Sequence, residues 1–179
     1  MKYYIVSDIH GSSANLEKVL QMFDEDGDYL IVLGDILYHG PRNDLPANYE
    51  PKKVAAMLNE RKEKIIAVRG NCDGEVDQMV LEFPITADYQ MLPFDGYKIF
   101  VTHGHLYDEN LKWVGEQDAV LFGHIHIPVA EKINGLLYLN PGSISLPKME
   151  SVPSYGVLEN DVFTIYDLDK NIVNSYKIK

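Results

Sequence analysis

The stretch "YYIVSDIHGSSANLEKVLQMFDEDGDYLIVLGD" (residues 3–35) decides the fold class, because it places a helix pattern between two strand patterns. The runs at 3–7 and 29–34 are short, rich in β-branched and aromatic residues, and typical of buried strands. Residues 12–27 repeat apolar side chains at helical spacing, at Leu16, Val19, Leu20 and Phe23. A strand, a helix and a strand in succession predict a parallel pair and therefore an α/β fold.

This alternation continues through a third strand pattern at 64–68 and then changes. A second helix pattern at 51–62 begins with proline, which is favoured at the first helical position. The second half contains strand patterns separated mostly by turns, at 98–103, 119–123, 135–140, 154–159, 162–168 and 171–178. One short helix is expected within 108–116. Strands joined by turns favour antiparallel pairing, so we expect a second sheet packed on the first.

The composition is that of an ordinary globular chain. With 179 residues, 46% hydrophobic and 24% charged, the sequence predicts one domain spanning 1–179 with a sizeable core. No apolar run approaches the roughly 18 residues that a bilayer span needs, and the first residues lack the features of a secretory signal. Cys72 is the single cysteine, which excludes an internal disulfide and a cysteine-rich zinc site. We therefore expect a cytoplasmic protein without a membrane partner.

The charge balance restricts the class of partner. Sixteen basic and 27 acidic residues give a formal net charge of −11. Such a field repels polyanions, whereas surfaces that bind nucleic acids usually carry a basic stripe. The charge therefore argues against a nucleic-acid polymer as partner. If the chain acts on phosphate, positive charge must be supplied locally.

Polar side chains follow five predicted strands at the point where each ends. The motifs are SDIHG (7–11), GDIL (34–37), RGNCDG (69–74), THGH (102–105) and GHIH (123–126). The carboxyl ends of strands form the functional crevice of open α/β sheets, so we expect these motifs to meet. Each motif alone has a structural explanation, such as a turn or a helix N-cap. Because all six histidines lie in or beside these motifs, a metal site explains them better than independent turns.

The candidate metal ligands carry nitrogen or oxygen donor atoms. They are Asp8, His10, Asp35, Asn71, His103, His124 and His126. Seven donors are too many for one tetrahedral ion and suit two divalent ions that have five or six ligands each. A mixed set without thiolate fits manganese, zinc, iron, cobalt or nickel, and does not favour calcium.

The order D-x-H, GD, GN-x-D, THGH, GH-x-H over residues 8–126 resembles the calcineurin-like metallophosphoesterase superfamily. LNPGS (139–143) is similar to the segment that follows in its small bacterial members. Three further segments resemble one subgroup, the bacterial YfcE-type phosphodiesterases: GDILYHGPRN (34–43), AVRGNCDGEVDQM (67–79) and FPITA (83–87). The resemblance implies a four-layer αββα sandwich, in which two mixed sheets are flanked by helices and the site lies at the sheet edges.

The resemblance also implies a ligand set for each of two ions, with manganese as the usual cofactor. One ion would take Asp8, His10, Asp35 and His126, and the other would take Asp35, Asn71, His103 and His124. Two divalent ions roughly 3.5 to 4 Å apart lower the pKa of a bridging water and clamp the phosphoryl oxygens. Four positive charges against the carboxylates of Asp8 and Asp35 leave about +2, which supplies the missing local charge.

The predicted function is hydrolysis of a small-molecule phosphodiester by a metal-activated hydroxide at a dinuclear site. A phosphomonoesterase and a non-catalytic protein-binding scaffold on the same fold are the alternatives, and assembly into a homo-oligomer is left open. The intact ligand set argues against the scaffold.

One position departs from the family pattern. Many members have histidine after the asparagine, as a candidate general acid, whereas this chain has Cys72. A small buried residue and a direct role are equally good interpretations, and in an extended segment Cys72 would point away from Asn71. Protonation of the leaving group is then weak or comes from His39, His105 or water, which favours aryl esters.

The loop at 38–51 is longer than most connections, and long loops in compact domains are often functional. Its His39 and Arg42 are candidate contacts for the substrate phosphate, with a solvated loop charge as the alternative for Arg42.

Overall fold

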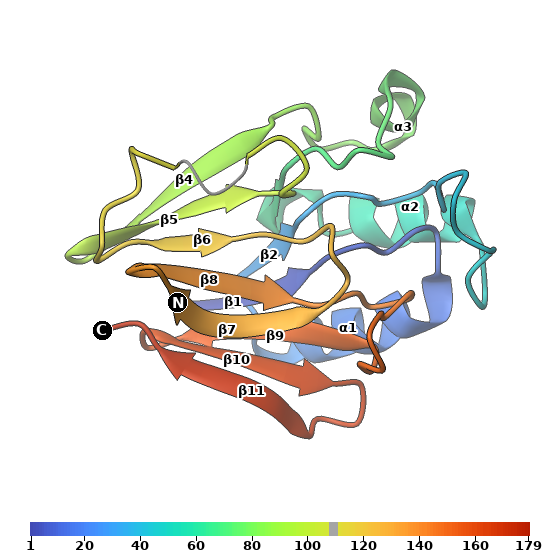
Figure 1. The fold of residues 1–179 in the computed structure, drawn as a ribbon. Helices are drawn as coiled ribbons and strands as arrows, with labels where there is room; N and C mark the ends of the chain where they lie inside the picture. Colours follow the sequence, from blue (N-terminus) through green and yellow to red (C-terminus); the bar gives the residue numbers. More distant parts are fainter. Residues whose placement is uncertain (108–110) are drawn as a thin grey trace.

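The computed structural model describes residues 1–107 and 111–179, which form two β-sheets packed face to face (Figure 1). The first sheet has the strand order β11 (Ile172–Lys177), β10 (Val162–Asp167), β9 (Ser154–Glu159), β1 (Lys2–Val6), β2 (Tyr29–Val32), β3 (Ile65–Ala67). The second has the order β4 (Tyr89–Phe94), β5 (Tyr97–Thr102), β6 (Ala119–Leu121), β8 (Leu136–Pro141), β7 (Pro128–Ile133). Both sheets mix parallel and antiparallel pairs, so the predicted fold class is confirmed.

The centre of the first sheet is the parallel unit predicted from residues 3–35. β1 pairs with β2 and β2 with β3, both in parallel. On β1, Tyr4 and Val6 join the core under the helices, whereas Tyr3 and Ile5 join the core between the two sheets. Both faces of the strand are therefore buried, which is why its sequence is a continuous apolar run.

Two helices, α1 and α2, form where the sequence patterns place them and cover the outer face of the first sheet (Figure 1). α1 (Ser13–Asp26) buries its predicted apolar residues, and α2 (Pro51–Asn59) begins at the expected proline. α2 ends before the predicted residue 62, and a short 3₁₀ turn, Lys62–Lys64, follows it. Among the helices of residues 1–107 and 111–179, none is both long and apolar enough to cross a membrane.

The pairing of the second half differs from the expectation in two respects. The strands predicted at 154–159, 162–168 and 171–178 extend the first sheet, with β9 antiparallel to β1, instead of joining the second. In the second sheet β6 lies parallel to both β5 and β8, so antiparallel pairing was a wrong prediction there. Parallel neighbours need a crossover of about a dozen residues or more, and the long connections before β6 and β8 provide it.

Two strands and one helix were missed by the sequence analysis. β4 and β7 form the edges of the second sheet, and they contain Pro93 and Pro128. Proline is tolerated at an edge because no ladder hydrogen bond is lost there, but it breaks up a strand pattern. α3 (Glu75–Val80) has six residues, which is too short for an apolar repeat to show.

Loops and turns lie over the outer face of the second sheet in the described residues. Leu111 packs there against Phe100 and Val120. The helix predicted within 108–116 is wrong for 111–116, which form turns, and 108–110 lie outside the described residues. The Gly115 amide donates to the Asp118 carboxylate at 2.8 Å, and such local bonds compete with helix formation.

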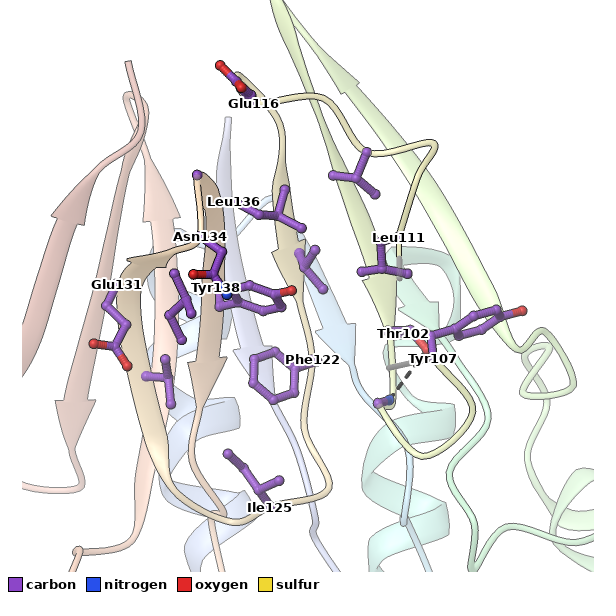
Figure 2. Close-up of a pocket in the computed structure, with 16 residues that line it drawn as sticks. Thr102, Tyr107, Leu111, Glu116, Phe122, Ile125, Glu131, Asn134, Leu136 and Tyr138 are labelled. Carbon is purple, nitrogen blue, oxygen red and sulfur yellow. Dashed lines mark hydrogen bonds between the residues drawn. The ribbon is translucent and has the colours of Figure 1, made fainter. Parts of the chain in front are cut away.

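The same outer face carries a largely apolar cavity of about 800 Å³ (Figure 2). Its lining includes Leu111, Phe122, Leu136 and Tyr138. Among the described residues, its walls contain none of the candidate metal ligands. The chemistry predicted from the sequence is therefore located elsewhere, at the carboxyl ends of the strands.

Candidate metal centre

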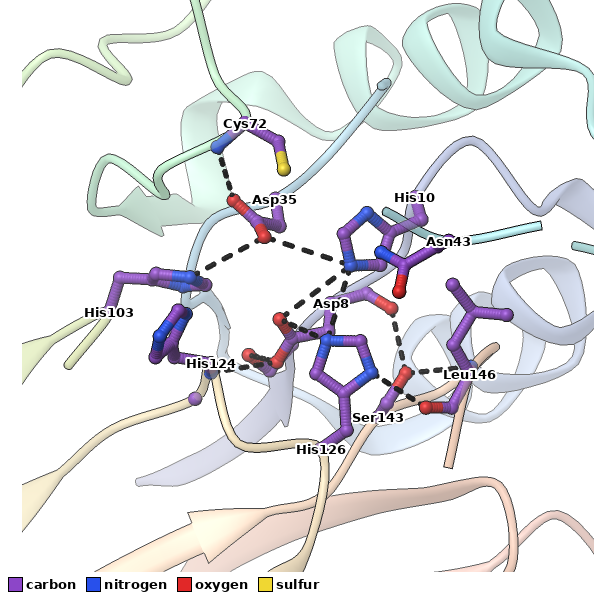
Figure 3. A network of polar contacts seen from close by, with 12 residues as sticks. Asp8, His10, Asp35, Asn43, Cys72, His103, His124, His126, Ser143 and Leu146 are labelled. Carbon is purple, nitrogen blue, oxygen red and sulfur yellow. Dashed lines mark hydrogen bonds and ion pairs between the residues drawn. The ribbon is translucent and has the colours of Figure 1, made fainter. Parts of the chain in front are cut away.

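The candidate ligands follow the carboxyl ends of five strands, and Figure 3 shows six of the seven gathered around one space. β1 is followed by Asp8 and His10, β2 by Asp35, β3 by Asn71, β5 by His103, and β6 by His124 and His126. The first three strands belong to one sheet and the last two to the other. The centre therefore lies where the edges of the two sheets meet.

Sharp backbone turns aim these side chains inward. Five ligand candidates have positive φ angles between 48° and 65°: Asp8, His10, Asp35, His124 and His126. This left-handed region is uncommon for residues other than glycine, although aspartate and histidine enter it more readily than most. Strained conformations of this kind cluster at functional sites, where the surrounding structure holds them in place.

Two glycines allow the loops to approach one another closely. A Cβ atom on Gly123 would lie 1.9 Å from Ser7 Oγ, and one on Gly70 would lie 2.2 Å from the Asp35 amide nitrogen. Real Cβ atoms do not make such contacts. The glycines of the GHIH and RGNCDG motifs are therefore required by the packing of the loops around the centre.

Three imidazoles are oriented by backbone carbonyls. The Nδ1 atoms of His10, His103 and His126 lie 2.8, 2.6 and 2.6 Å from the carbonyl oxygens of Tyr38, Leu33 and Leu146. Since a carbonyl oxygen only accepts, each Nδ1 carries the hydrogen, and each ring in its neutral form presents a lone pair at Nε2. Metal-binding histidines are commonly fixed in this way.

Asp8 lies at the bottom of the centre and is fully buried. Its Oδ2 accepts hydrogen bonds from Ser7 Oγ at 2.6 Å and from the His124 amide at 3.0 Å. Its Oδ1 lies 3.2 Å from His126 Nε2 and 3.8 Å from His10 Nε2 and has no hydrogen-bond partner in the described part of the chain. Burial opposes ionisation, but His126 and the other neighbours outweigh it and hold the pKa of Asp8 below its ordinary value.

Asp35 lies between the rings of His10 and His103. Its Oδ1 accepts the Cys72 amide at 2.8 Å, which leaves Oδ2 at 3.7 Å from His10 Nε2 and 3.5 Å from His103 Nε2. Burial alone would raise the pKa of Asp35, but the hydrogen bond and positive charge of His103 lower it well below its usual range. The carboxylate is therefore ionised and can face cations on either side.

His103 and Asn71 form a pair at one side of Asp35. The Asn71 carboxamide oxygen lies 3.1 Å from His103 Nε2. Burial would lower the pKa of His103, but Asp35 and Asp8 outweigh it and raise the pKa to about 9. The protonated ring therefore places a positive charge beside these oxygens.

His124 and His105 lie at the more open side of the centre. The His124 ring centroid is 5.1 Å from that of His103, and the His105 ring is 5.3 Å from His103 and 6.2 Å from His124. Both rings are half-buried, and burial lowers the pKa of each. Both are therefore neutral near pH 7.

The donor atoms form three groups whose members all lie within 4.8 Å of one another. They are Asp8 with His10 and His126, Asp8 with Asp35 and His103, and His10 with Asp35 and Cys72. His10 Nε2 and His126 Nε2 face each other at 3.3 Å, although the Nδ1 atom of each ring already carries the hydrogen. Opposed lone pairs beside the unpartnered Asp8 Oδ1 are a donor set that fits divalent cations.

Cys72 lies closer to the centre than the sequence analysis expected. Asn71 Nδ2 donates to Cys72 Sγ at 3.3 Å, so the expectation that Cys72 points away from Asn71 is wrong. Residues 71 and 72 lie in a bend, in which consecutive side chains do not alternate as they do in a strand. Burial and the nearby Asp35 charge raise the pKa of the thiol to about 12, which keeps it neutral.

A cleft of about 890 Å³, which we call the metal-centre cleft, opens above these residues. Its walls include Tyr38, Arg42, Ile125 and Lys148. The positively charged side chains of Arg42 and Lys148 are exposed. Lys148 was not considered in the sequence analysis, because an exposed lysine carries no recognisable signal.

His39 and His105 lie outside the described lining of the metal-centre cleft. The His39 ring packs edge-on between Tyr38 and Tyr49, at centroid distances of 4.8 and 5.4 Å. The Nδ1 atoms of both histidines are buried and lack a hydrogen-bond partner within residues 1–107 and 111–179. Their predicted contacts with substrate stay predictions.

Buried polar residues support the ligand loops. The Asp73 carboxylate accepts the amides of Asp35, Ile36 and Gly70 at 2.8, 2.8 and 2.7 Å. Burial raises its pKa to about 6 despite these bonds. The sequence contained a signal for Asp73, which is the last residue of GNCD, but its contacts with another loop could not be seen there.

Ser143, in the NPGS segment, is a second support. Its Oγ donates to the Asp8 carbonyl at 2.9 Å and accepts the Leu146 amide at 2.8 Å (Figure 3). It thus ties the loop after β8 to the loop after β1, although it points no free atom at the ligands. Ser143 therefore stabilises the turn at 143–146 and also contacts the backbone of Asp8, one of the candidate ligands.

Comparison with known proteins places the chain in a family. Residues 1–162 match the calcineurin-like phosphoesterase superfamily domain. Over 176 residues the chain is 50% identical to phosphodiesterase YfcE of Escherichia coli K12, covering 97% of this chain and 96% of that protein. A solved structure of YfcE, described as a phosphoesterase from E. coli, has a TM-score of 0.96 and 48% identity over 100% of both chains. "Probable metallophosphoesterase YsnB" of Bacillus subtilis is 31% identical, over 95% of this chain and 92% of that protein. The resemblance drawn from the motifs is confirmed, and the chain belongs to the calcineurin-like phosphoesterase superfamily.

Proposed function

We propose that this protein is a metal-dependent phosphodiesterase that hydrolyses small phosphodiesters with two divalent cations. We expect both cations to be manganese. The observation that carries the proposal is the set of inward-facing donor atoms around Asp8 Oδ1, a buried oxygen without a hydrogen-bond partner among the described residues. An apolar core would not retain such a set, because unpaired buried polar atoms are costly. The 50% identity to a phosphodiesterase over nearly the whole chain supports the diester class.

The two cations would be held by the ligand sets that share Asp35. One cation would be bound by Asp35 together with Asp8, His10 and His126. The other would be bound by Asp35 together with Asn71, His103 and His124. When bound, such ions lower the pKa of a water molecule and neutralise charge on the phosphoryl oxygens. Hydrogen bonds from Nδ1 to backbone carbonyls hold the rings of His10, His103 and His126 with Nε2 directed inward, so these rings need not reorient when a cation binds.

Arg42 and Lys148 contribute the second source of positive charge. Both line the metal-centre cleft and are exposed. In a chain of net charge −11 they attract a small anion to this cleft, while the overall field still disfavours a long polyanion. We propose that Arg42 contacts the substrate phosphate, because guanidinium geometry matches two phosphoryl oxygens.

Steady-state assays of purified protein test the proposed function. Bis(4-nitrophenyl) phosphate should be hydrolysed with manganese and not with excess chelator. Asp35→Asn should lower kcat by about 100-fold or more, since one carboxylate serves both ligand sets. Asp95→Asn, which changes an exposed carboxylate of the β4–β5 turn, should leave kcat unchanged.

Three outcomes contradict the proposal in different ways. Undiminished activity in chelator excludes the metal mechanism. Activity on 4-nitrophenyl phosphate alone indicates a phosphomonoesterase, and inactivity toward both esters indicates a non-catalytic scaffold.

Weak protonation of the leaving group is a further part of the proposal. Cys72 occupies the position at which many superfamily members have histidine, and its thiol is a poor proton donor at neutral pH because its pKa is raised to about 12. His39, His105 or water remain as proton sources. We therefore expect diesters with aryl leaving groups to react faster than alkyl diesters. Equal kcat values on both, with chemistry rate-limiting, would contradict this part alone.

A further inference from the structure

A second cleft, of about 700 Å³, is lined by residues of α2 and α3. Two side chains, Tyr38 and Cys72, line both this second cleft and the metal-centre cleft. Cys72 Sγ also lies within 4.8 Å of donor atoms of His10 and Asp35. The two clefts are therefore neighbours that share part of one wall.

The walls of the second cleft are mainly apolar. α2 contributes Ala55 and Ala56, α3 contributes Val80, and the loop after β2 contributes Leu37. Val80 and Tyr38 are 50% and 40% exposed, so their apolar surfaces are open to a ligand. Apolar surface of this kind favours an apolar or aromatic group over a charged one. Lys52 and Asp77 also line this cleft and bring one charge of each sign, whereas Arg42 and Lys148 bring two positive charges to the metal-centre cleft.

Hydrogen bonds and ring contacts hold the walls in place. Asn59 of α2 donates from Nδ2 to the Val80 carbonyl at 2.9 Å and accepts the Glu82 amide at 2.9 Å. These bonds fix the end of α3 against α2. On the other side, the His39 ring packs between the rings of Tyr38 and Tyr49. The cleft is therefore a formed feature and does not depend on the ligand to order it.

We infer that the second cleft binds one ester group of the substrate, so that the preferred substrates are phosphodiesters with a bulky apolar or aromatic ester group. This inference rests on the proposed phosphodiesterase function. A phosphodiester has two organic groups, and the cations with Arg42 account only for its phosphoryl oxygens. The second cleft shares two wall residues with the metal-centre cleft, Tyr38 and Cys72, and therefore lies beside that phosphoryl position.

Two substitutions test the inference from opposite walls. Ala56→Phe fills the second cleft from α2, where Ala56 is exposed and its replacement leaves the core unchanged. Val80→Lys makes the α3 wall polar. Glu60→Phe is the matched control, because it adds the same ring at the exposed end of α2 outside the lining. The measurements are KM and kcat for bis(4-nitrophenyl) phosphate, the inhibition constant of inorganic phosphate, metal content, and molar mass by light scattering.

Both cleft variants should raise KM by about tenfold or more, as expected when an aromatic group loses its apolar site. The inhibition constant of inorganic phosphate should not change, because phosphate has no ester group, and Glu60→Phe should behave as wild type. If wild type is active and the cleft variants match Glu60→Phe, the inference is overturned. A changed molar mass with unchanged KM would assign the cleft to a second copy of the chain, which also overturns it. Wild type inactive toward diesters would overturn the proposed function instead.

Discussion

The ligand side chains are held by bonds that a sequence does not display. The residue types were sufficient to nominate the seven candidate ligands, because each follows a strand and carries a donor atom. The supports were not predictable, since Ser143 and Asp73 bond to loops that are remote along the chain. Cys72 was misjudged because strand alternation was assumed where the backbone bends.

Asp73→Asn tests the support of the Asp35 loop. An amide has one acceptor oxygen where the carboxylate has two, so at least one of the three buried amides loses its partner. We expect the free energy of unfolding to fall by about 1–3 kcal/mol in urea titrations. Asp77→Asn is the control, because this half-buried carboxylate accepts one amide, that of Gly74. Equal losses in the two variants would contradict the role given to Asp73.

Gly123→Ala tests the close approach of the GHIH loop to β1. The added methyl would overlap Ser7 Oγ, so the loop must shift and move His124 and His126 with it. We expect a loss of about 1–3 kcal/mol in the free energy of unfolding and weaker metal binding by calorimetry. Gly74→Ala serves as control, since its Cβ would meet its nearest atom at 3.7 Å. Unchanged metal affinity in Gly123→Ala would show that this contact does not position the histidines.

Secondary elements with buried faces were the ones that the sequence revealed. β1, β2 and α1 bury long apolar surfaces, and their bounds agree with the prediction within two residues. The edge strands β4 and β7 contain three exposed residues each and a proline, so their pattern was weak. Local patterns do not show which sheet a strand joins, because that depends on pairing between distant parts of the chain. The sheet of β9, β10 and β11 could therefore not be predicted.

An exposed ion pair between helical elements gives a prediction for pH. Arg61, just after α2, donates to both carboxylate oxygens of Asp24 in α1, with Nε–Oδ1 at 2.8 Å and Nη2–Oδ2 at 2.5 Å. The hydrogen bond with Arg61 lowers the pKa of Asp24 below its ordinary 3.8. Its stabilisation is therefore complete above pH 3.8 and is lost as pH falls through the lowered pKa.

Asp24→Asn should cost less than about 1 kcal/mol of unfolding free energy at pH 7, because solvent screens the pair. Urea titrations at several pH values should show the difference from wild type shrinking below pH 3.8. Asp95→Asn, at a fully exposed position, should show no such dependence. A difference in unfolding free energy between Asp24→Asn and wild type that grows in acid would contradict the lowered pKa of Asp24.

In the molecule as a whole, the metal centre joins the two sheets. Asp8, His10 and Asp35 follow strands of the first sheet, whereas His103, His124 and His126 follow strands of the second. Cations held by all of them, as proposed, would cross-link the layers and stabilise only the folded chain. At a free concentration of 100 times the dissociation constant, this linkage contributes about 2.7 kcal/mol.

Thermal unfolding should therefore occur at higher temperature with manganese than with chelator. Asp35→Asn should remove most of the increase, because both ligand sets lose a member. Asp95→Asn should retain it. An increase of equal size in Asp35→Asn would mean that manganese binds elsewhere on the protein.

Anomalous diffraction from crystals grown with manganese tests the dinuclear centre most directly. The account predicts two anomalous peaks on either side of Asp35 Oδ2, one beside Asp8, His10 and His126, and the other beside Asn71, His103 and His124. A map without peaks at these residues, from crystals that contain ample manganese, would contradict it.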